Sequence, residues 1–267
     1  MSSIDVPLRN GRFGATARPD AWWLQPTLTL LGLSIFIVYS TWSAFQGQYY
    51  RFGPYLSPFY SPELLGDPVR AWFGAFPAWW PHWAPLSAAL LVLWMPGGFR
   101  VTCYYYRGAY YKAFWADPPS CTVAEPRDKY RGERYLPLVL QNVHRYFLYG
   151  ALIFLIILGL DVWHALWFTD AATGQTHFGI GLGTIVLAVN WVLLTSYTLG
   201  CHSLRHLVGG RLDEISKSPV RDNAYSCVSC LNRRHMLFAW LSLSSVMFAD
   251  IYVRLCAMGI WSDWRIV

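Results

Sequence analysis

The sequence predicts an all-α membrane protein, a bundle of five transmembrane helices. Of its 267 residues, 55% are hydrophobic and only 13% are charged, whereas about 25% of residues are charged in an ordinary soluble domain. Five stretches are long and apolar enough to cross a bilayer, which takes about 20 residues as a helix. The 15 Trp, 17 Tyr and 15 Phe residues suit the membrane surfaces, where aromatic rings concentrate. We expect one multi-pass domain over residues 1–267, surrounded by lipid in the plasma membrane.

The first three predicted spans cover about residues 22–46, 83–105 and 136–168. No charged residue occurs from Ala21 to Tyr50. The second uncharged stretch opens with prolines at 77, 81 and 85, so we expect an irregular, Trp-rich loop before the helix, because proline disrupts helix interiors. The third span is an apolar block flanked by Arg145 and Asp161.

The fourth and fifth predicted spans cover about residues 177–208 and 235–261. The fifth contains Asp250 and Arg254. Ionisable groups at membrane depth are costly and usually pair with one another, and residues four apart share one helix face. We expect an internal ion pair, with a proton path as the alternative.

Most basic residues fall in the N-terminal arm and in the loops after spans two and four. These residues are Arg9, Arg12 and Arg18, then Arg107, Lys112, Arg127, Lys129, Arg131 and Arg134, then Arg211, Lys217, Arg221, Arg233 and Arg234. The positive-inside rule therefore predicts a cytoplasmic N-terminus and an outer C-terminus. Because the +6 net charge collects in these loops as a topology signal, we expect no nucleic-acid partner.

Two Cys-x4-His units, Cys201 to His206 and Cys230 to His235, are the strongest chemical signal. Two thiolates and two imidazoles are the ligands of a Rieske-type [2Fe-2S] cluster. The predicted topology brings both units to the cytoplasmic ends of spans four and five. We therefore predict a metal centre at this helix connection.

The exact ligand set stays open. Residues five apart on a regular helix point about 140° away from each other, so the helix must end, unwind or bend for Cys201 and His206 to share a cluster. Glycines at 200, 209 and 210 allow such irregularity. His202 and His206 share one helix face, and Cys227 and Cys230 have a common metal-binding spacing, so these four form an alternative set. A structural zinc site is the alternative metal.

The other histidines suggest a second hypothesis, that the helix bundle binds haem. His144 lies in the cytoplasmic half of span three, where we expect a polar contact near a cofactor or quinone. We expect the run Tyr104, Tyr105, Tyr106 and Arg107, at the cytoplasmic end of span two, to anchor the chain at the membrane interface. The alternative is that Tyr104 and Arg107 line a quinone pocket. His82, His164 and His177 lie near outer helix ends, where interfacial positions are a better explanation than axial ligation of haem.

Two segments resemble the membrane anchor of respiratory complex II, succinate dehydrogenase or fumarate reductase. They are Gly-Cys-His-Ser-Leu-Arg-His-Leu at 200–207 and Ser-Cys-Val-Ser-Cys-Leu-Asn-Arg-Arg-His at 226–235. They are most similar to the actinobacterial type, in which a transmembrane Rieske-type cluster takes the place of haem. The resemblance extends over nearly the whole chain, and its specificity lies in these two segments.

The resemblance implies a subunit of a succinate:quinone oxidoreductase with no dehydrogenase site of its own. A flavoprotein subunit with FAD and an iron-sulfur subunit with further clusters would dock on the cytoplasmic face. Electrons would pass through the [2Fe-2S] cluster to a quinone, with menaquinone expected. The alternatives are a five-helix anchor that binds haem b, which the concentration of Cys and His at one connection disfavours, and a zinc-stabilised docking subunit without a redox role.

Overall fold

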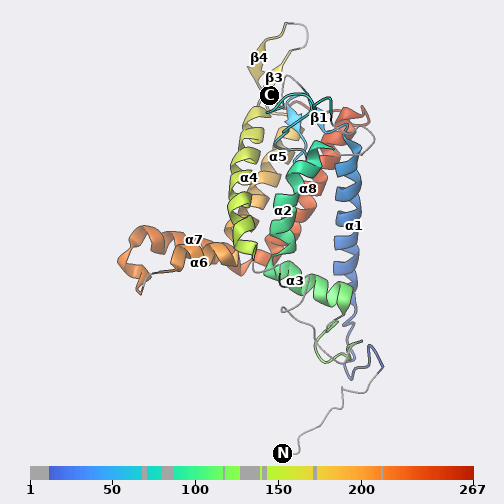
Figure 1. The fold of residues 1–267 in the computed structure, drawn as a ribbon, viewed down its shortest axis with the longest axis vertical. Coiled ribbons are helices and arrows are strands. Elements are labelled where there is room, and N and C mark those ends of the chain that lie inside the picture. Colours follow the sequence, from blue (N-terminus) through green and yellow to red (C-terminus); the bar gives the residue numbers. More distant parts are fainter. Residues whose placement is uncertain are drawn as a thin grey trace, which may run out of the picture. The chain divides into compact units, whose positions relative to one another are not determined.

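The computed structural model describes residues 12–67, 71–79, 87–116, 118–126, 139, 143–170, 173–211 and 213–267. The protein is mostly helical (Figure 1). Its elements in chain order are α1 Leu24–Gln46, β1 Arg51–Phe52, β2 Tyr55–Leu56, α2 Ala88–Val101, α3 Tyr104–Tyr110, the π-helix η2 Tyr111–Trp115, α4 His144–His164, β3 Trp167–Thr169, β4 Thr176–Phe178, α5 Leu182–Leu199, α6 His202–Gly209, the 3-10 helix η4 Ile215–Lys217, α7 Pro219–Arg233 and α8 His235–Ala257.

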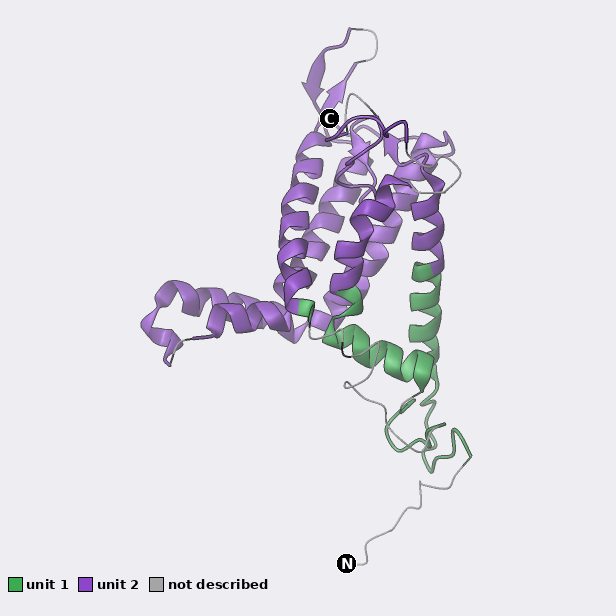
Figure 2. Ribbon diagram, viewed as in Figure 1, with its two compact units in different colours: residues 1–37, 100–144 green, residues 38–99, 145–267 purple. Residues whose placement is uncertain are grey.

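Two compact units divide the chain (Figure 2). The first comprises residues 1–37 and 100–144, and the second comprises residues 38–99 and 145–267. The second unit holds α5 to α8, all of α4 except His144, and both β-hairpins. The strands of each hairpin are antiparallel.

Four helices in the described part of the chain are long and apolar enough to cross a membrane: α1, α4, α5 and α8. Helix α2 is also apolar, but its 14 residues extend only about 21 Å, against about 30 Å of bilayer hydrocarbon. The predicted second span begins at residue 83, and residues 80–86 lie outside the described part. The five-span arrangement and its orientation therefore stay predictions.

Helices α4 and α5 are each shorter than the predicted span that contains them. Helix α5 ends at Leu199 because Cys201 has an extended backbone, with φ −65° and ψ 136°. The start of the predicted fourth span is strand β4, and the end of the third is a turn into β3. The hydropathy of apolar residues such as Trp167 and Phe178 does not indicate whether they form a strand or a helix.

Polar contacts between backbone and side chains join the helices of the second unit. Trp191 on α5 donates its indole N–H to the carbonyl of Leu155 on α4 at 2.8 Å. Ser245 on α8 donates to the side-chain oxygen of Asn190 on α5 at 3.0 Å. Each contact satisfies a polar group away from water, where an unpaired one would be costly.

The expected ion pair on α8 is confirmed and is the centre of a buried polar network. Asp250 is fully buried and Arg254 is 3% exposed, with Nε of Arg254 3.4 Å from Oδ2 of Asp250. Tyr39 and Ser43, both on α1, donate to the same oxygen at 2.6 and 2.8 Å. Ser57, after β2, donates to the other oxygen. The carboxylate thus joins α8 to α1 and to the loop after it.

The Arg254 guanidinium has further partners in the same network. Its Nη1 donates to the carbonyl of Gln48 at 3.0 Å and its Nη2 to Ser43 Oγ at 2.6 Å. Its Cζ lies 5.1 Å from the centre of the Trp42 ring. Hydrogen bonds and the aromatic ring together compensate for the loss of water around the cation.

Asp263, in the C-terminal tail, joins three elements at the end of the second unit where α8 finishes. It accepts hydrogen bonds from Tyr55 at 2.8 Å, Tyr252 at 2.7 Å and the backbone N–H of Gly183 at 2.9 Å. These donors belong to β2, α8 and α5. The tail therefore closes the end of the unit at which α8 finishes.

We predict that Asp250→Leu lowers the stability of the chain by about 3–5 kcal/mol, because it leaves the Arg254 charge buried without its partner. Asp250→Leu combined with Arg254→Leu should recover most of that loss, because no unpaired charge remains. Thermal unfolding of the detergent-solubilised protein measures both. A single variant that melts with the wild type would contradict the structural role of the pair.

Candidate metal centre at a helix junction

Two helix breaks lie together where α5 and α8 meet. Helix α5 ends before Gly200, and Cys201 caps the start of α6. Helix α7 packs against α6 and α5 and breaks at Arg234, with φ −112° and ψ 20°, before His235 begins α8. In Figure 1, α6 and α7 extend sideways from the end of the helices. The two Cys-x4-His units therefore flank the same junction.

Gly200 permits the closest approach at this junction. A Cβ atom at this position would lie 2.9 Å from the carbonyl oxygen of Ser196, 3.2 Å from the carbonyl carbon of Leu231 and 3.3 Å from Nδ1 of His235. Asn232 donates its side-chain amide to the Gly200 carbonyl at 2.8 Å. The last turn of α7 thus packs directly on the end of α5, and His235 lies beside the residue that precedes Cys201.

Cys201 and His235 lie on the inner side of the junction. Cys201 is only 2% exposed. The His235 ring stacks on Tyr197 with ring centres 4.9 Å apart and an angle of 15° between the planes. Tyr197 in turn contacts Phe99 edge-on at 5.6 Å. One thiol and one imidazole therefore occupy an apolar, aromatic environment.

His202 and His206 form an exposed pair one turn apart on α6. Their Nε2 atoms are 3.0 Å apart, so one ring donates and the other accepts. Partial burial lowers the pKa of His202 below its ordinary value, and the neighbouring His206 and Arg205 lower it further. The neutral imidazole favoured in this way is also the form that binds metals.

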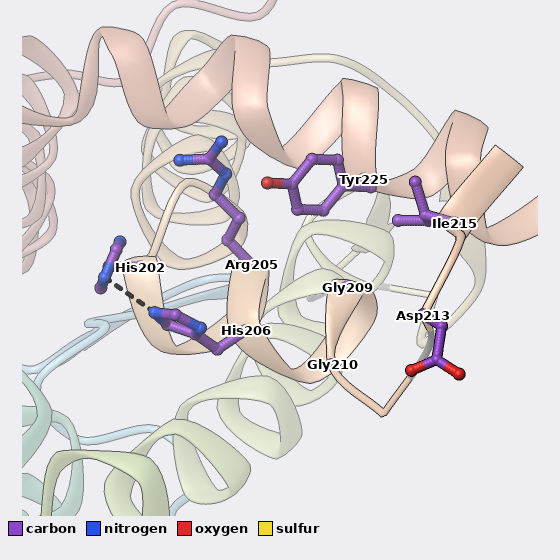
Figure 3. Close-up of a pocket in the computed structure, with 8 residues that line it drawn as sticks. All are labelled: His202, Arg205, His206, Gly209, Gly210, Asp213, Ile215 and Tyr225. Atoms are coloured by element: carbon purple, nitrogen blue, oxygen red, sulfur yellow. Dashed lines mark hydrogen bonds between the residues drawn. The ribbon is translucent and has the colours of Figure 1, made fainter.

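A pocket of about 360 Å³ opens beside this histidine pair (Figure 3). It is lined by His202, Arg205, His206, Gly209, Gly210, Asp213, Ile215 and Tyr225. Arg205 lies over the Tyr225 ring, with its Cζ 5.0 Å from the ring centre. A side chain at Gly209 would meet that ring at 2.8 Å, so the glycine lets α6 and α7 pack closely.

The other two cysteines among the predicted ligands, Cys227 and Cys230, lie on the exposed surface of α7. The structure brings His235 close to the Gly200–Cys201 junction and pairs His206 with His202. Among the residues described, no group of three or more His, Cys, Asp or Glu side chains is placed to hold a metal ion. The predicted set of four ligands therefore stays a prediction.

Comparison with known proteins identifies the family. The family described as actinobacterial succinate dehydrogenase subunit SdhC matches residues 24–259. The chain belongs to this family. A solved structure, the Mycobacterium smegmatis Sdh1 complex in the apo form, contains a chain that is 44% identical, with 94% of each chain covered and a TM-score of 0.84. No curated protein matches the chain.

Membership of the SdhC family makes the chain a multi-pass membrane subunit of succinate dehydrogenase. Within this subunit, the helix junction around Gly200 holds Cys201 and His235, one residue from each Cys-x4-His unit.

The predicted quinone residues of this SdhC-family chain lie in the first compact unit. His144 is 3% exposed, and its Nδ1 lies 2.8 Å from Oγ1 of Thr102. Tyr104 is exposed, and the Arg107 guanidinium lies 4.8 Å from the centre of its ring. The expected polar contact of His144 is thus present, whereas quinone binding stays a prediction.

Thr102 and Tyr106 also belong to the first unit. The sequence did not single out Thr102, and it indicated Tyr106 only as one of three consecutive tyrosines. Tyr106 is buried and accepts a hydrogen bond from Nη1 of Arg100 at 2.8 Å. Burial raises its pKa to about 12. The sequence of three consecutive tyrosines, Tyr104 to Tyr106, does not indicate which of the rings is buried.

The other histidines do not gather with these residues. His177 is on β4, next to Arg265, and His164 ends α4. His82 lies outside the described residues.

We predict that Gly200→Ala destabilises the junction by about 1–3 kcal/mol, because its Cβ would overlap atoms of Ser196 and Leu231. Gly97→Ala on α2 is the matched control, because nothing lies within 4 Å of its Cβ position. The control should be neutral or slightly stabilising. Equal melting temperatures for the two variants would show that the close approach at Gly200 is unimportant.

Proposed function

We propose that this SdhC-family subunit anchors succinate dehydrogenase in the membrane and relays electrons from the iron-sulfur subunit to a quinone through a Rieske-type [2Fe-2S] cluster. The observation that carries the proposal is the junction at Gly200. It places His235, from one Cys-x4-His unit, beside the backbone that leads into Cys201 of the other. Two cysteines and two histidines are the ligands that such a cluster requires.

Cys201, His206, Cys230 and His235 would hold the cluster. In a Rieske-type centre, two thiolates bind one iron and two imidazoles the other, and the neutral imidazoles raise the reduction potential. The buried Cys201 and the stacked His235 ring suit such a role, because apolar surroundings exclude water from a ligand set. His206 and Cys230 lie on α6 and α7, and these helices would have to shift to complete the set.

The alternative ligand set, His202 and His206 with Cys227 and Cys230, is favoured by a different observation. The Nε2 atoms of the two histidines already converge to 3.0 Å. All four side chains lie on the α6–α7 hairpin, so no buried residue is needed. This set would suit zinc as well as iron.

The proposed electron acceptor is a membrane quinone, with menaquinone expected. We assign His144, Tyr104 and Arg107 as residues that would contact it. His144 is supported because a buried imidazole beside the Thr102 hydroxyl can exchange a proton. Arg107 and Tyr104 offer a cation and an aromatic ring within 4.8 Å of one another.

The proposed partners are a flavoprotein subunit with FAD and an iron-sulfur subunit with its own clusters. They would dock on the membrane face that carries the α6–α7 hairpin, which the count of basic residues makes cytoplasmic. Electrons would then enter this subunit near the helix junction.

The test is low-temperature electron paramagnetic resonance of the purified complex after mild reduction. We predict a Rieske signal of low average g in the wild type and in the control variant His177→Ala, whose histidine lies on β4. The double variant His206→Ala, His235→Ala should lose the signal and quinone reduction, while the partner subunits still oxidise succinate with a soluble electron acceptor.

Two other outcomes would change the proposal. A signal that survives in the double variant would reject the first ligand set and favour residues from the second. A wild-type complex that contains zinc and gives no such signal would reject the relay, and the subunit would then be a docking platform stabilised by zinc.

A further inference from the structure

One face of α4 exposes an unbroken row of apolar and aromatic side chains. The members recur every three or four residues, and each is 48–72% exposed: Tyr146, Tyr149, Ile153, Ile156, Leu160 and Trp163. This spacing defines a single helix face. In a membrane-spanning helix, such a face contacts lipid.

Helix α5 carries a second row of the same kind. Leu182, Ile185, Val189 and Val192 recur with the same spacing and are 38–53% exposed. The two helices are neighbours, because the Trp191 side chain of α5 donates to the Leu155 carbonyl of α4. Both rows therefore belong to the lipid-facing surface of the second unit.

The β3–β4 hairpin, which connects α4 to α5, continues the row of α4. Its register places Trp167 opposite Phe178, with ring centres 5.9 Å apart. Trp163, the last member of the α4 row, lies 5.8 Å from the Trp167 ring. The exposed aromatic surface thus passes from the helix onto the hairpin without interruption.

The opposite face of the hairpin carries the buried Phe168 and the exposed His177, and the C-terminal tail holds it in place. Because successive side chains of a strand alternate between faces, Phe168 and His177 point away from the Trp167–Phe178 pair. The Arg265 guanidinium lies 4.0 Å from the centre of the Phe168 ring, and its Nη1 is 2.9 Å from Nε2 of His177. The tail thereby fixes which face of the hairpin turns outward.

The polarity of the outward face changes along the hairpin. The next pair on the same face, Thr169 opposite Thr176, is polar and exposed. Helix α4 has 21 residues and extends about 31 Å, enough to fill about 30 Å of hydrocarbon. The aromatic pair therefore falls within the headgroup layer, which Trp prefers, and the threonines fall nearer to water.

We propose that the β3–β4 hairpin is an interfacial anchor whose Trp167–Phe178 face lies among the headgroup and glycerol groups of the lipids. It acts at the end of α4 opposite the α6–α7 hairpin (Figure 1). By resisting movement into either water or hydrocarbon, the aromatic pair sets the depth of α4 and α5. This inference is independent of the metal site.

The test is photo-crosslinking from single positions in the complete complex, reconstituted in vesicles of phosphatidylethanolamine and phosphatidylglycerol. Phe178→p-benzoylphenylalanine and, separately, Trp167→p-benzoylphenylalanine report on the proposed anchor face. Ile156→p-benzoylphenylalanine is the lipid-facing positive control. His177→p-benzoylphenylalanine probes the opposite face of the same strand. Size-exclusion chromatography confirms assembly of each variant before irradiation.

We expect intact-mass spectra to show the mass of one phospholipid added at positions 178, 167 and 156 but not at 177. Crosslinks from 178 and 167 to a protein chain would overturn the proposal, because a protein would then cover the face. Lipid adducts at 156 alone would also overturn it, because the hairpin would then lie in water.

Discussion

The hydrogen bond from the Asn232 amide to the Gly200 carbonyl holds together the two helix ends on which the candidate metal centre depends. Residue 200 has no side chain, and a Cβ atom there would lie 3.2 Å from the carbonyl carbon of Leu231 in the last turn of α7. Both helix breaks lie at this point. The approach therefore brings Cys201 of one Cys-x4-His unit and His235 of the other to the same junction.

The other end of the second unit is held by buried charge rather than by close backbone packing. Asp250 and Arg254 pair on α8, and hydroxyl groups from α1 and the following loop complete the network. In a membrane subunit, the hydrogen bonds of this network fix the geometry of the helices as well as stabilising them, because water cannot compete for the buried groups. The second unit can thus accommodate irregular backbone at the junction, while the buried charges hold its opposite end closed.

Sequence reasoning predicted the features that depend on composition and local spacing. Asp250 and Arg254 were expected to pair because four residues separate them on one helix, and the need for irregular backbone near Cys201 followed from helix geometry. It did not predict that α5 ends at Leu199, because that end depends on the extended backbone of Cys201. It did not predict that Trp167 and Phe178 pair across a hairpin, because hydropathy is the same for apolar strands and helices. Nor did it separate the buried Cys201 from the exposed Cys227 and Cys230, since burial depends on how α6 and α7 pack.

The most direct test of a mixed Cys and His centre is pulsed electron paramagnetic resonance on the reduced wild-type complex with histidine labelled with nitrogen-15. A Rieske-type centre predicts strong coupling of the unpaired electron to two histidine nitrogens in the subunit that contains the junction. A reduced complex whose signals show no histidine nitrogen coupling would contradict a Rieske-type centre in this subunit.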